Sequence, residues 1–134
     1  MRYLLDTNTC IYIMNQSPEQ VFRKAETLKP GEVGISSITF YELAFGMAKS
    51  QRALENRRRL EGFVAQVPVQ PFDGEAADIA ATLRLNLQKA GTPIGPYDLL
   101  IAAHALSLNL TLVTNNLREF ERVEGLPLEN WLEP

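Results

Sequence analysis

The sequence contains almost none of the residues that form disulfides or soft-metal sites. It has one cysteine, Cys10, and one histidine, His104, among 134 residues. A single cysteine excludes an internal disulfide and fits a reducing compartment. Because Cys10 lies among apolar neighbours, we expect it to pack in the core rather than to react. We likewise expect His104 to pack or to form a hydrogen bond rather than to bind a metal.

Long hydrophobic runs and an excess of basic charge are also missing. No apolar run approaches the roughly 20 residues of a membrane span, and the N-terminus lacks the pattern of a signal peptide. We therefore expect no membrane association and a cytoplasmic location. The chain has 13 Lys and Arg against 16 Asp and Glu, a net charge of −3. A typical nucleic-acid binder is strongly basic, but charge sorted by face keeps nucleic acid open as a partner.

Three widespread motifs are absent as well. The chain contains no Gly-x-x-x-x-Gly-Lys, no Gly-x-Gly-x-x-Gly and no Gly-x-Ser-x-Gly. These absences remove support for an NTPase, a dinucleotide-binding enzyme or a serine hydrolase. With 46% hydrophobic residues the chain can build a sizeable core, and its length predicts a single domain over residues 1–134.

The elements that are present alternate between short strands and helices. Buried strands are expected at residues 3–5, 33–36 and 111–113, and further short strands at 67–72 and 126–131. Helices are expected at residues 9–15, 18–28, 38–49, 51–66, 73–90 and 96–108. Ser17 is the expected N-cap of the second helix. This alternation predicts an α/β fold with a central parallel sheet of about four to five strands and helices on both faces.

Oxygen-bearing side chains follow the ends of these strands. Asp6 comes directly after the first strand, and Asn116 follows the strand at 111–113. Right-handed crossovers place the carboxyl ends of parallel strands, and the helix starts that follow them, at one edge of the sheet. Asp98 lies in the first turn of a predicted helix, and Glu42 lies about one turn into another. These four side chains are therefore expected to converge.

Each acid also has an ordinary structural interpretation. Asp6 can cap the helix that follows it, and Asp98 is favoured in a first helical turn by the helix dipole. Glu42 is expected in an apolar stripe with Tyr41 and Phe45, unless it is a boundary residue that reaches solvent. Taken together, however, three carboxylates in one pocket repel each other unless a cation is present. Oxygen ligands of this kind suit Mg²⁺ or Mn²⁺.

An acidic pocket that holds Mg²⁺ beside scattered arginines fits hydrolysis of a phosphodiester. Arg57, Arg58, Arg59 and Arg118 are the candidate contacts to a nucleic-acid backbone. Each basic cluster has a solvated helix face as its alternative.

Four blocks of the sequence resemble PIN-domain ribonucleases in their order and spacing. The blocks are LLDTN at 4–8, ISSITFYELAFG at 35–46, PIGPYDLLIAAHA at 93–105 and LVTNNLREF at 112–120. The resemblance spans essentially the whole chain and is closest to the VapC toxins of type II toxin–antitoxin pairs. It implies a Mg²⁺-dependent endoribonuclease fold around a central parallel sheet, with Mn²⁺ as a substitute metal.

The resemblance also implies roles for individual residues. Asp6, Glu42 and Asp98 match the acidic metal site of the family, and Asn116 stands at a fourth position that is often Asp. Asp6 and Asp98 would hold the principal metal, and Glu42 would bind it through water or position the attacking water. Asn116 would complete the shell or contact a second metal. Glu119 is the alternative fourth acid, although we expect it to be solvated.

Thr7, Asn8 and Thr114 are candidates to orient the carboxylates. For the two threonines, local hydrogen bonding to the backbone is an equal alternative.

Partners are implied by the resemblance alone. They are a second copy in a homodimer, a VapB antitoxin whose C-terminal segment lies across the active site, and an RNA substrate. The stretches 91–104 and 114–122 resemble the branch that cuts initiator tRNA in its anticodon stem-loop, which would inhibit translation. Two other classes stay open: a non-cleaving PIN-like module that binds RNA or protein, and a metal-dependent DNA nuclease or phosphatase.

Overall fold

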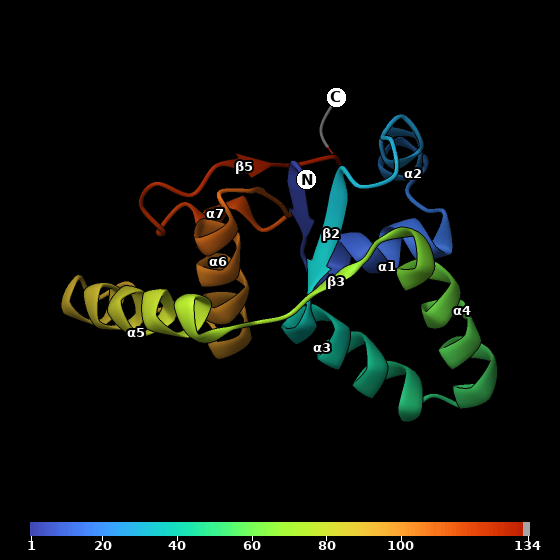
Figure 1. The fold of residues 1–134 in the computed structure, drawn as a ribbon, viewed down its shortest axis with the longest axis horizontal. Coiled ribbons are helices and arrows are strands. Elements are labelled where there is room, and N and C mark those ends of the chain that lie inside the picture. Colours follow the sequence, from blue (N-terminus) through green and yellow to red (C-terminus); the bar gives the residue numbers. More distant parts are fainter. Residues whose placement is uncertain (133–134) are drawn as a thin grey trace.

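A five-stranded parallel sheet forms the centre of the molecule (Figure 1). The structure, a computed structural model, describes residues 1–132, so the last two residues of the expected domain lie outside the described residues. The strands are β1 (Tyr3–Leu5), β2 (Val33–Ser36), β3 (Val69–Gln70), β4 (Thr111–Val113) and β5 (Leu128–Glu129). Their order across the sheet is β3-β2-β1-β4-β5, and every neighbouring pair is parallel. The predicted parallel α/β fold is confirmed.

The helices alternate with the strands along the chain. Within the described residues they are α1 (Thr7–Asn15), α2 (Glu19–Glu26), α3 (Ser37–Ala48), α4 (Ala53–Gln66), α5 (Gly74–Lys89), α6 (Pro96–Leu108) and α7 (Leu117–Phe120). The prediction that Ser17 caps α2 is wrong. Pro18 is the N-cap, without a side-chain hydrogen bond, because the Ser17 backbone N–H still bonds back to Tyr12 at the end of α1.

The period of two along the central strands divides the core into two halves. Leu5, Ile35 and Val113 are in register on one face, where they pack with α1, α2, α3 and α4. Leu4 and Leu112 point to the other face, where they pack with α5, α6 and α7. Helices thus cover both faces of the sheet, as predicted.

The lone cysteine and the lone histidine are both structural. Cys10 is fully buried in the first half of the core. His104 is also buried, with its Nδ1 2.8 Å from the Oγ of Ser36 and its ring edge-on to Phe72. Ser36 in turn accepts a hydrogen bond from the backbone N–H of Ile38 and caps α3. This contact joins the start of α3 to the middle of α6. The expected packing of Cys10 and the expected hydrogen bonding of His104 are confirmed.

The predicted apolar stripe of α3 is wrong in part. Tyr41 and Phe45 are 52% and 58% exposed, whereas Thr39 and Leu43 face the core. Because α3 packs on the sheet through Thr39 and Leu43, the side of the helix that carries the aromatic stripe faces outward. No helix in residues 1–132 combines the length and the apolar character needed to cross a membrane.

The central strand predicts where truncation is most costly. Leu5 is fully buried between neighbours on both sides. Leu5→Ala should lower the free energy of unfolding by about 2–5 kcal/mol, because it leaves a cavity in a packed core. Leu54→Ala, at a side chain that is 69% exposed, should change it little. Urea unfolding of the two variants beside the wild type tests this, and equal losses would contradict it.

Candidate active site

The carboxyl edge of the sheet carries the predicted acids. Strand β1 ends immediately before Asp6, and β2 leads directly into α3, which carries Glu42 (Figure 1). Asp98 lies in the first turn of α6. Since α1, α3 and α6 all begin at this edge, the positive ends of their dipoles lie close to the acids.

Asp6 is a helix cap and an inward carboxylate at the same time. It is only 6% exposed, and its Oδ1 accepts a hydrogen bond of 2.8 Å from the backbone N–H of Thr9. Burial raises the pKa of Asp6, and hydrogen bonds from Thr114 and Thr9 partly offset that rise. The capping interpretation of Asp6 is therefore correct, and it leaves the residue at the same edge as the other acids.

Asp98 and Glu119 form a close carboxyl pair. Glu119 is half-buried, and its Oε1 accepts a 2.8 Å hydrogen bond from the backbone N–H of Gly95. Burial, a hydrogen bond with Glu119 and the charges of Glu119, Glu42 and Asp6 raise the pKa of Asp98 to about 7. The expectation that Glu119 is solvated is wrong, because the short helix α7 turns it back toward the start of α6. No periodic signal marks a helix of this length.

Glu42 and Asn116 complete the edge in different ways. Glu42 is half-buried and accepts a 2.7 Å hydrogen bond from the hydroxyl of Thr7. Asn116 is exposed, and its amide donates a 2.6 Å hydrogen bond to Oε2 of Glu119. Asn116 thus contacts Glu119, the alternative candidate for the fourth acid. Its role as a metal ligand stays a prediction.

The three candidate orienting residues differ in what they contact. Thr7 binds Glu42 directly. Thr114 hydrogen-bonds to Asp6, and its Oγ1 also accepts the backbone N–H of Asn116 at 2.9 Å. For Thr114 the side-chain and the backbone interpretations both apply. Asn8 is exposed on the first turn of α1.

The donor chemistry of this edge fits a hydrated divalent cation. Within residues 1–132, no three Asp, Glu, His or Cys side chains come close enough together to hold one metal ion. Mg²⁺, however, commonly keeps several waters and binds through one or two carboxylates and the phosphate of its substrate. Burial raises the pKa of Asp98 most, the neighbouring charges of Glu119, Glu42 and Asp6 add to that rise, and a cation would offset these charges. The pair formed by Asp98 and Glu119 supplies the one or two carboxylates that such a hydrated ion needs.

The predicted arginine cluster lies on α4 and is partly engaged within the protein. The guanidinium of Arg57 stacks 5.3 Å from the ring centre of Phe40, and Arg59 donates to Asn15 at 2.9 Å. Arg58 and Arg118 are exposed. Arg118 precedes Glu119 on α7 and is therefore adjacent in sequence to the acids. RNA contact by these four residues stays a prediction.

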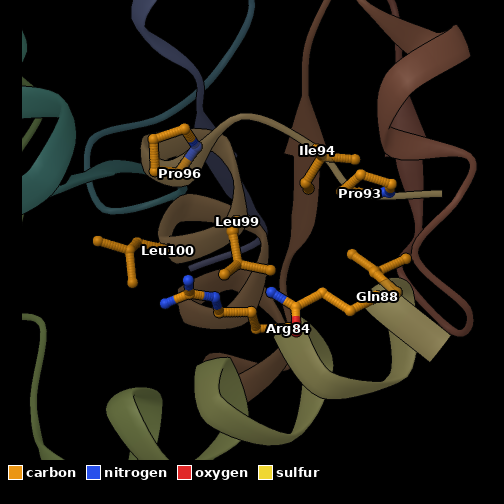
Figure 2. A pocket seen from close by; sticks show the side chains of 8 residues that line it. Arg84, Gln88, Pro93, Ile94, Pro96, Leu99 and Leu100 are labelled. Atoms are coloured by element: carbon orange, nitrogen blue, oxygen red, sulfur yellow. The ribbon is translucent and has the colours of Figure 1, made fainter. Parts of the chain in front are cut away.

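One hollow lies against the start of α6, and another reaches Glu42. A cavity of about 380 Å³ lies between α5, the loop before α6 and the first half of α6 (Figure 2). Apolar side chains line it together with Arg84 and Gln88, and no carboxylate does. A groove of about 250 Å³ runs between α1 and α3, where Ile11 and Glu42 are among its lining residues. Only the second hollow reaches an acid of the site.

Comparison with known proteins gives one consistent result. Residues 3–126 match the model of the PIN domain. The chain is 44% identical over 131 residues to the tRNA(fMet)-specific endonuclease VapC of Salmonella typhimurium, with 98% of each protein covered. It is 41% identical over 132 residues to Ribonuclease VapC2 of Rickettsia felis, again with 98% of each covered. The crystal structure of DNA-bound VapBC from Salmonella typhimurium matches it with a TM-score of 0.92 at 44% identity, covering 98% of each chain.

The carboxyl pair of Asp98 and Glu119 predicts that the free energy of unfolding depends on pH. The pKa of Asp98 is about 7 in the folded protein, against an ordinary value of 3.8. Between these values the folded state keeps a proton that the unfolded chain has lost, so the free energy of unfolding falls as pH rises. With EDTA present, the melting temperature of the wild type should fall from about pH 5 to about pH 8.

The variant Asp98→Asn should show a flatter profile, because it removes the titrating group. Asp78→Asn, at an exposed position on α5, should follow the wild type. Parallel profiles for all three proteins would mean that Asp98 does not titrate in this window.

Proposed function

The chain belongs to the PIN-domain family, and from that membership we propose that it is a metal-dependent endoribonuclease that hydrolyses phosphodiester bonds of RNA. The observation that carries the proposal is the arrangement of Asp6, Glu42, Asp98 and Glu119 at one edge of the sheet, where burial and the neighbouring acids raise the pKa of Asp98. PIN-domain nucleases use a divalent metal. We assign Mg²⁺, with Mn²⁺ as a substitute, because every candidate ligand is a hard oxygen.

The residues divide the chemistry among them. Asp6 and Asp98 would hold the metal, and Glu119 would add charge beside Asp98. A bound Mg²⁺ would lower the pKa of a coordinated water and neutralise charge that develops on the phosphate. Glu42, oriented by the hydroxyl of Thr7, positions the attacking water. Asn116 fixes the Glu119 carboxylate through its amide and offers its carbonyl oxygen to the same shell.

The substrate and the biological role follow from the relatives. Because relatives are named tRNA(fMet)-specific endonuclease VapC, we assign initiator tRNA as the substrate, cut in the anticodon stem-loop. Cleavage there removes a tRNA that initiation requires and so inhibits translation. The protein acts in the cytoplasm, where this substrate is found.

The toxin role also calls for partners. VapBC complexes among the matching structures support a cognate VapB antitoxin, and the resemblance to the family adds a homodimer of this chain. The C-terminal segment of the antitoxin would occupy the groove between α1 and α3, which exposes Ile11 and reaches Glu42. A peptide seated there blocks access to the acids.

One cleavage assay distinguishes the proposed function from two other candidate functions. A non-cleaving RNA- or protein-binding module would leave all substrates intact, although the acids are present. A DNA nuclease or phosphatase would act on DNA or on a phosphomonoester instead. Protein free of antitoxin should cut tRNA when Mg²⁺ is supplied and should not cut it without Mg²⁺. It should leave DNA and the phosphomonoester intact in both conditions.

Removal of one charge should abolish cleavage without unfolding the protein. Asp98→Asn should reduce the rate of tRNA cleavage at least about 100-fold, since metal-assisted activation of water depends on this carboxylate. Asp78→Asn is the matched control and should cleave normally. Circular dichroism confirms that both variants fold. Near-normal cleavage by Asp98→Asn would remove this residue from the site.

The fourth position should show in the response to metal. Mg²⁺ should raise the melting temperature of the wild type, because it binds only the folded state. Glu119→Gln should weaken that response, Asn116→Asp should strengthen it, and the double variant Asp6→Ala, Asp98→Ala should lose it. Glu124→Gln, exposed after α7, is the control. Calorimetric titration measures the affinities, and an unchanged affinity in Glu119→Gln would return the fourth position to Asn116 alone.

A further inference from the structure

Two exposed tyrosines meet beside the acids. Tyr41 on α3 is 52% exposed and Tyr97 on α6 is 43% exposed. Their ring centres lie 5.6 Å apart, their planes are inclined by 58°, and their hydroxyl oxygens are 3.4 Å apart. Each tyrosine directly precedes an acid of the site, Glu42 or Asp98. The pair therefore spans the two helices that carry these acids.

Core packing does not account for this pair. Helix α3 packs on the sheet through Thr39 and Leu43, and α6 packs through residues such as Ile101. The two rings lie outside both core clusters and touch each other instead. Their mutual contact holds two aromatic faces in a defined arrangement at the surface, which lowers the entropy cost of binding a flat ligand.

We infer that Tyr41 and Tyr97 form a stacking platform for an unpaired base of the RNA substrate, next to the phosphate that is cut. This inference rests on the proposed function. The acids repel the RNA backbone wherever a cation does not offset their charge, so contacts that do not depend on charge strengthen binding at this edge. Aromatic side chains supply such contacts, because every base has a face that stacks on them. Bases in loops are unstacked and open to this mode of recognition.

The position of the pair favours RNA over a protein partner. Phe45 lies one turn further along α3 and is 58% exposed, with the ammonium of Lys49 5.1 Å from its ring centre. A protein that covers this face of α3 would bury Phe45 together with Tyr41 and would not require Tyr97. A base seated at the acids would use both tyrosines and leave Phe45 free. Phe45 is therefore the matched control.

The test compares single variants in steady-state cleavage of an anticodon stem-loop RNA with Mg²⁺. Tyr41→Ala and Tyr97→Ala should each raise KM roughly tenfold, the scale of one lost base stack, with a smaller effect on kcat. Tyr41→Phe and Tyr97→Phe keep the rings and should restore KM to within about twofold of the wild type. Phe45→Ala should behave as the wild type. Melting temperatures show that each variant is folded.

A modified substrate identifies the base as the partner of the rings. RNA with one abasic nucleotide beside the cut has nothing to stack, so the penalty of Tyr97→Ala should shrink on it. Unchanged KM in both alanine variants, or an equal penalty on intact and abasic RNA, overturns the inference while wild-type cleavage still supports the proposed function. Weakened dimerisation or antitoxin binding in Phe45→Ala and Tyr41→Ala alike, with KM unaffected, assigns the face to a protein. Absence of RNA cleavage by the wild type overturns the proposed function and the inference together.

Discussion

Repulsion between carboxylates at one edge of the sheet is the constraint that the rest of the structure accommodates. Four acids lie at this edge, and burial, the hydrogen bond with Glu119 and the charges of Glu119, Glu42 and Asp6 together raise the pKa of Asp98 to about 7. The fold supplies partial compensation through three helix starts directed at the same edge. Local donors complete it: the backbone of Thr9 binds Asp6, and the backbone of Gly95 binds Glu119. The remaining imbalance makes the edge receptive to a cation.

The parallel sheet allows these acids to lie at one edge without weakening the core. Its two core halves are built from short apolar strands whose alternate residues serve opposite faces. Because helices cover both faces, the carboxyl edge is the place where strand ends and helix starts meet open solvent. The acids therefore lie together at this edge without disturbing the packing. The apolar residues of the short strands stabilise the core, and the residues that follow the strand ends carry the acids.

Much of this arrangement could be predicted from the sequence, and the exceptions share a cause. Strand ends and helix starts are local features, so Asp6 and Asp98 could be placed at one edge from the pattern alone. Glu119 could not, because its direction depends on Gly95, which lies 24 residues away in the chain. The stripe of Tyr41 and Phe45 was expected inside and is outside. Helical period shows that residues share a face, but tertiary packing decides which face is buried.

The buried contact between Ser36 and His104 has a consequence for anyone who wishes to redesign this surface. It links the cap of α3 to α6 at 2.8 Å, between two buried side chains. The spacing between α3 and α6 is thus set by a contact inside the protein. Exposed side chains on the two helices can therefore be exchanged while the distance between the helices stays the same.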